Sequence, residues 1–71
     1  MNETRRNKFR RLAIYRTNAV LEKLRLLGNL SNKSNYEYTD EEINKIFSAI
    51  DAQLKSAKLR FTNKSKSEFK L

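Results

Sequence analysis

The chain has 71 residues, and its 16 Lys and Arg against 8 Asp and Glu give a formal net charge of +8. It contains no cysteine and no histidine, which excludes disulfides, thiolate metal sites and the side chain most often used as a general base. We therefore expect no enzyme activity, no metal ion, no cofactor and no small-molecule substrate. A domain this small gains only about 3–5 kcal/mol from its core, so association with another chain often adds stability.

The first predicted element is a helix from about residue 4 to residue 27. This segment contains neither glycine nor proline and is rich in Arg, Leu, Lys and Ala, which all favour helix. Gly28 follows the last leucine directly. We expect Gly28 to end the helix in the left-handed conformation, with Leu30 in contact with the last turn.

A polar segment, residues 28–39, joins this helix to the next one. Its Asn and Ser residues are typical of turns, because their side chains form hydrogen bonds with nearby backbone groups. We expect the chain to reverse direction here. Tyr36 has two interpretations, which stay open: it packs under the loop, or it contacts a partner.

The second helix is predicted from about residue 40 to residue 61. Thr39 is a good N-cap, Glu42 completes a capping box, and Tyr38 and Ile43 occupy the positions of a hydrophobic staple. Residues 62–71 are polar and cationic without periodicity, which predicts a flexible basic tail. The apolar residues after the cap form a stripe about 100° wide, made of Ile43, Ile46, Phe47, Ile50, Leu54, Ala57 and Phe61.

The apolar residues of the first helix occupy a wider arc, about 180°. One neighbouring helix covers only a single seam of such a surface. We therefore expect an all-α fold, an antiparallel two-helix hairpin that dimerises into a four-helix bundle. In the alternative, Arg16 and Lys23 narrow the apolar face of the first helix so much that a monomer can cover it. The predicted partner interface consists of Leu12, Tyr15, Ala19, Leu26 and Tyr36.

Charge is distributed unevenly: residues 1–12 carry +4, residues 28–42 carry −3 and residues 43–71 carry +5. In an antiparallel hairpin both chain ends lie at the same end of the molecule, so their cations form one basic pole. Arginine suits this role because its guanidinium binds phosphate with two parallel hydrogen bonds. The residues predicted to bind nucleic acid are Arg5, Arg6, Lys8, Arg10, Arg11, Arg16, Lys55, Lys58, Arg60, Lys64 and Lys66.

The functional prediction is a cytoplasmic protein that binds the backbone of RNA or DNA with little sequence preference. The start of the chain lacks the apolar core of a secretory signal, and no run approaches the roughly 20 apolar residues that span a bilayer. The first alternative is a protein-interaction module, such as a small regulator, adaptor or inhibitor of phage or mobile-element type, that docks through the apolar face of the first helix and the loop tyrosines. The second is binding to a membrane surface through the basic, amphipathic first helix.

Overall fold

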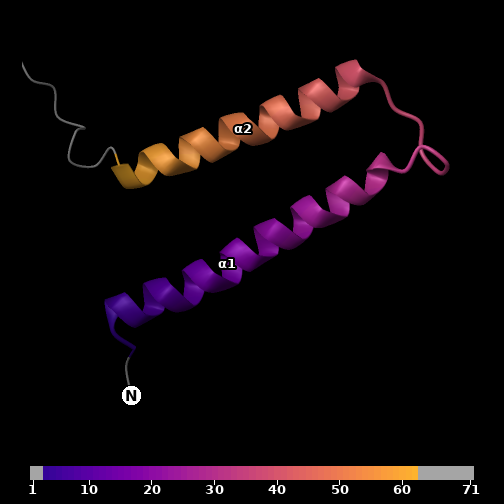
Figure 1. Ribbon diagram of the computed structural model, residues 1–71. Helices are drawn as coiled ribbons and strands as arrows, with labels where there is room; N and C mark the ends of the chain where they lie inside the picture. The colour runs from indigo at the N-terminus through magenta and orange to yellow at the C-terminus, as the bar shows by residue number, and fades with distance from the viewer. Residues whose placement is uncertain (1–2, 63–71) are drawn as a thin grey trace, which may run out of the picture. The chain divides into compact units, whose positions relative to one another are not determined.

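The computed structural model describes residues 3–62, and its two long helices are drawn in Figure 1. In chain order the elements are α1 (Arg5–Gly28), the short 3-10 helix η1 (Asn29–Ser31) and α2 (Asp40–Thr62). Residues 3–62 contain helices and no strand, so the all-α prediction is confirmed. The chain divides between Glu37 and Tyr38 into two units, each built around one long helix.

Thr4 is the N-cap of α1. Its backbone is extended, its Oγ1 accepts the Asn7 N–H at 3.0 Å, and its carbonyl oxygen accepts the Lys8 N–H at 2.9 Å. Asn7 stands at the position where Glu or Gln would complete a capping box. The first turn of α1 holds no acidic residue and begins with Arg5 and Arg6, so two cations lie at the positive end of the helix dipole.

The C-terminal end of α1 differs from the prediction. Gly28 has φ −62° and ψ −26°, which is right-handed helical geometry, and no residue of the described chain has a positive φ. The left-handed closure was therefore wrong. The chain tightens into η1, and the Asn29 N–H donates to the carbonyl oxygens of the preceding turn, those of Arg25, Leu26 and Leu27. Because 3-10 geometry satisfies these carbonyls, the helix ends without a left-handed residue.

The segment after η1 is organised around Asn32. Its side-chain Oδ1 accepts the Ser34 N–H at 2.9 Å, and its carbonyl oxygen accepts the amides of Asn35 at 3.1 Å and Tyr36 at 3.0 Å. This is the local bonding that makes Asn common in turns. Tyr36 follows the turn with 47% of its surface exposed.

The start of α2 has the predicted capping box. The Thr39 N–H donates to Oε1 of Glu42 at 2.9 Å, and the Glu42 N–H donates to Oγ1 of Thr39 at 3.1 Å. Tyr38 and Ile43, the two positions of the hydrophobic staple, are both half-buried. Asp40 and Glu41 join Glu42 in the first turn, where the helix dipole favours negative charge.

Neither helix buries its apolar side chains. Among residues 3–62 no side chain is fully buried, and the least exposed apolar residues of α1 are Leu12, Ala13 and Leu27, which are half-buried. In α2 the half-buried positions are Ile43 and Ile50. A helix of this length gains most of its stability by packing its apolar face against another surface. Each helix therefore needs another surface against which its apolar face can pack.

Replacing Gly28 with alanine tests the geometry of this helix end. A Cβ at position 28 meets no atom within 4 Å, and the backbone angles suit any L residue. We expect Gly28→Ala to raise the free energy of unfolding by about 0.5–1 kcal/mol, because glycine loses more backbone freedom on folding. The measurement is urea denaturation followed by circular dichroism.

The matched control places D-alanine at position 28 by chemical synthesis. D-Alanine favours positive φ, so D-alanine at position 28 should lower the free energy of unfolding, whereas L-alanine should raise it. The opposite order of the two variants would show that position 28 adopts the left-handed conformation.

Candidate nucleic-acid interface

Five cations gather in the first two turns of α1, and we call residues 5–11 the cationic segment. All five side chains are exposed. At 100° per residue they point in nearly all directions around the helix axis, so no single face of the helix holds them. The five are Arg5, Arg6, Lys8, Arg10 and Arg11.

Most of these cations lack a carboxylate partner among residues 3–62. Arg5, Arg6, Lys8 and Arg10 form no salt bridge with any residue in the described part of the chain, and the same holds for Arg16 further along α1. Their positive charges are not neutralised locally. This stretch of α1 is therefore a source of positive potential for a polyanion.

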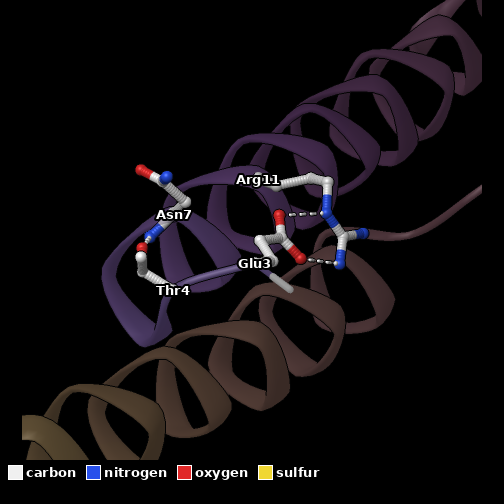
Figure 2. Close-up of polar contacts among 4 residues, drawn as sticks. All are labelled: Glu3, Thr4, Asn7 and Arg11. Atoms are coloured by element: carbon white, nitrogen blue, oxygen red, sulfur yellow. Dashed lines mark hydrogen bonds and ion pairs between the residues drawn. The ribbon is translucent and has the colours of Figure 1, made fainter. Parts of the chain in front are cut away.

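Arg11 differs, because it is paired with Glu3. Nε of Arg11 donates to Oε2 of Glu3 at 2.9 Å, and Nη2 donates to Oε1 at 3.0 Å. Figure 2 shows the carboxylate lying against one edge of the guanidinium, with the two hydrogen bonds side by side. The extended backbone of Thr4 precedes the helix, and Glu3 lies just outside it. No local sequence pattern predicted this pair.

A second pair of the same kind lies towards the other end of α1. Nη2 of Arg25 contacts Oε2 of Glu22 at 2.6 Å, and Nε donates to Oε1 at 3.1 Å. The two residues are three positions apart on one helix, which is a common spacing for such pairs. Both pairs are exposed to solvent, where ion pairs contribute little to stability.

The pairing changes the acidity of the carboxylates. Hydrogen bonds from Arg11 hold the pKa of Glu3 below its ordinary value, and those from Arg25 do the same for the pKa of Glu22. The same hydrogen bonds raise the pKa of Arg11 and of Arg25. Both carboxylates are therefore ionised at neutral pH, and each accepts two hydrogen bonds from its arginine.

The predicted cations of α2 are Lys55, Lys58 and Arg60. All three are exposed, and none forms a salt bridge with a described residue. By helical periodicity, Lys55 and Lys58 lie on one flank of the apolar stripe and Arg60 lies on the other. Lys64 and Lys66 lie outside the described residues.

The predicted partner interface lies mainly on one side of α1. Leu12, Tyr15, Ala19 and Leu26 fall within a sector of about 60° at helical spacing. Tyr15 is 72% exposed and Leu26 is 42% exposed, whereas Leu12 is half-buried. Tyr36, the fifth predicted residue, follows the Asn32 turn. Four of the five thus share one surface of one helix.

Two other kinds of site depend on the carboxylates and the apolar runs of residues 3–62. No group of three or more His, Cys, Asp or Glu side chains is placed to hold a metal ion in this part of the chain. Neither α1 nor α2 has an apolar stretch long enough to cross a membrane.

The chain matches no protein-family model, no curated protein and no solved structure.

Removing Arg11 should change the titration of Glu3. We expect Arg11→Ala to raise the pKa of Glu3 towards the ordinary value of an exposed glutamate, because the two hydrogen bonds to the ionised form are lost. The measurement is an NMR titration of the side-chain carboxyl carbons.

The pH dependence of the Glu3–Arg11 ion pair follows from the lowered pKa of Glu3. The Glu3–Arg11 pair is complete above the ordinary glutamate pKa and is lost as pH falls through the lowered pKa of Glu3. Glu22 is the internal control, since its partner Arg25 is unchanged. An unaltered Glu3 titration in Arg11→Ala would contradict the pairing.

Proposed function

We propose that the protein binds the phosphate backbone of nucleic acid, RNA or DNA, through the cationic segment of α1, and that it is a binding protein rather than an enzyme. The observation that carries this proposal is a run of exposed cations in which Arg5, Arg6, Lys8 and Arg10 have no carboxylate partner among the described residues. Such cations displace the counterions that surround a polyanion, and this release drives binding.

The direction of these side chains supports contact with a groove. A helix lying in a nucleic-acid groove has phosphates on both sides, so cations on several faces can each reach a phosphate. Arg6 and Lys8 point to nearly opposite sides of α1 at helical spacing. Arginine also forms two parallel hydrogen bonds to one phosphate, which lysine does not.

The beginning of α1 adds to this potential. Backbone N–H groups at a helix N-terminus carry partial positive charge, and acidic residues normally balance it. Here Arg5 and Arg6 occupy the first two positions and no acidic residue lies in the first turn. This arrangement costs helix stability in the free protein. A bound phosphate would offset that cost.

The proposal includes a fold-back of the chain and a dimer. The chain reverses between the two helices, α2 covers part of the wide apolar face of α1, and a second copy covers the rest in a four-helix bundle. The mismatch in width, about 180° on α1 against about 100° on α2, supports this arrangement. Lys55, Lys58 and Arg60 would then join the cationic segment, and the homodimer would present two such clusters.

A second candidate function is docking on a larger protein. It is supported by the exposure of Tyr15, 72%, on the same side of α1 as Leu26 and Ala19. Tyrosine is enriched at protein interfaces because it combines a large contact area with a polar tip. This candidate uses the surface that the homodimer would bury, so the two compete for it.

Replacing Arg5, Arg6 and Arg10 with alanine tests the main proposal. The parent protein should bind a labelled DNA duplex or RNA hairpin at low salt, with an affinity that falls steeply as salt rises. On duplex DNA the triple variant should lower the slope of log affinity against log salt by about 0.9 per contact, or about 2.7 for three contacts. The measurement is fluorescence anisotropy over a salt series.

The matched control removes three cations elsewhere, with Lys23→Ala, Lys33→Ala and Lys45→Ala combined. It changes the net charge by the same amount and leaves the cationic segment intact. Alanine keeps helix propensity high at the helical positions of both variants. Equal loss of slope in the two variants, or no binding by the parent at low salt, would contradict the proposal.

A further inference from the structure

The position of Glu3 is not explained by helix stabilisation. It is the only acidic residue among the first 21 residues, which hold six Lys and Arg. An acidic residue stabilises a helix when it lies in the first turn, close to the free N–H groups. The first turn instead begins with Arg5 and Arg6, and Glu3 lies before the N-cap Thr4. Its contact is with the side chain of Arg11, eight positions later.

The geometry of that contact is the geometry of phosphate binding. Arg11 uses Nε and Nη2, two donors on one edge of the guanidinium, to hold the two oxygens of one carboxylate at 2.9 and 3.0 Å. Arginine presents the same paired donors to two oxygens of a phosphate. Figure 2 shows this edge of Arg11 facing the Glu3 carboxylate. A phosphate that approached the edge would have to replace Glu3.

The pair also neutralises one cation of the segment. Arg5, Arg6, Lys8 and Arg10 have no such partner among the described residues. Glu3 lies outside α1, so it can leave Arg11 without breaking a hydrogen bond of the helix ladder. Both features suit a group that is exchanged when a ligand binds.

We propose that Glu3 is an internal competitor for phosphate at Arg11, which nucleic acid displaces when it binds. This inference rests on the proposed nucleic-acid binding by the same segment. Arg11 becomes a phosphate contact only after Glu3 has left. Glu3 therefore weakens binding, because its ion pair with Arg11 must break before the phosphate contact forms. This restricts stable complexes to ligands that engage several other cations at once.

The test is Glu3→Gln, which keeps the shape of the side chain and removes its charge. The variant should bind the labelled duplex about two- to fivefold more tightly at low salt, in keeping with the modest strength of an exposed ion pair. Its salt slope on duplex DNA should stay close to the parental slope, because Arg11 contacts phosphate in both complexes.

The matched control is Glu22→Gln. It makes the same change in net charge and breaks the equivalent pair with Arg25, outside the cationic segment. This variant should bind with the parental affinity. In the background of Arg11→Ala, Glu3→Gln should no longer tighten binding, because the arginine that it frees is absent.

An NMR titration with the DNA duplex supplies a direct readout. The Nε–H signal of Arg11 and the carboxyl signal of Glu3 should move together in the parent as phosphate replaces the carboxylate. The inference is overturned if Glu3→Gln has the parental affinity, if Glu22→Gln tightens binding equally, or if the tightening persists without Arg11. Absence of binding by the parent is a different result, which contradicts the proposed function itself.

Discussion

The constraint on which the rest depends is that each helix has an apolar face and neither can bury it alone. No side chain among residues 3–62 is fully buried. A helix is held in water chiefly by packing of its apolar face, so both helices require a surface that covers them. The stripe on α2 is about 100° wide and the face on α1 is about 180° wide. In the proposed fold-back α2 packs against one part of the apolar face of α1, and in the proposed dimer the second copy packs against the rest.

In α1, the residues proposed for association and those proposed for phosphate binding occupy different parts of the helix. The cationic segment occupies the first two turns of α1, and most of the wide apolar face, with the exception of Phe9, begins at Leu12. Association through the apolar face would therefore leave the cations in solvent. The Glu3–Arg11 pair lies at the boundary between the two regions. In the proposed dimer the bundle would hold α1 in place, and the exposed arginines would bind the ligand.

Features set by neighbouring residues could be predicted from the sequence. The capping box of Thr39 and Glu42 is confirmed, because its signal lies within four residues of one turn. Gly28 shows the limit: its residue type permits a left-handed angle but does not require one, and a 3-10 turn satisfied the same carbonyls. The Glu3–Arg11 contact spans eight positions and depends on the extended backbone of Thr4, so no local pattern indicated it. The fold-back and the dimer are set by long-range packing and stay predictions.

Sedimentation equilibrium of the full chain, over a micromolar concentration range, distinguishes the proposed dimer from a monomer. We expect a species of twice the 8.4 kDa chain mass. Tyr15→Asp or Leu26→Asp should shift the mass towards that of one chain, since a charge in the buried seam is costly. A mass of a single chain throughout this range would contradict the account, and it would leave the apolar face of α1 for a different protein.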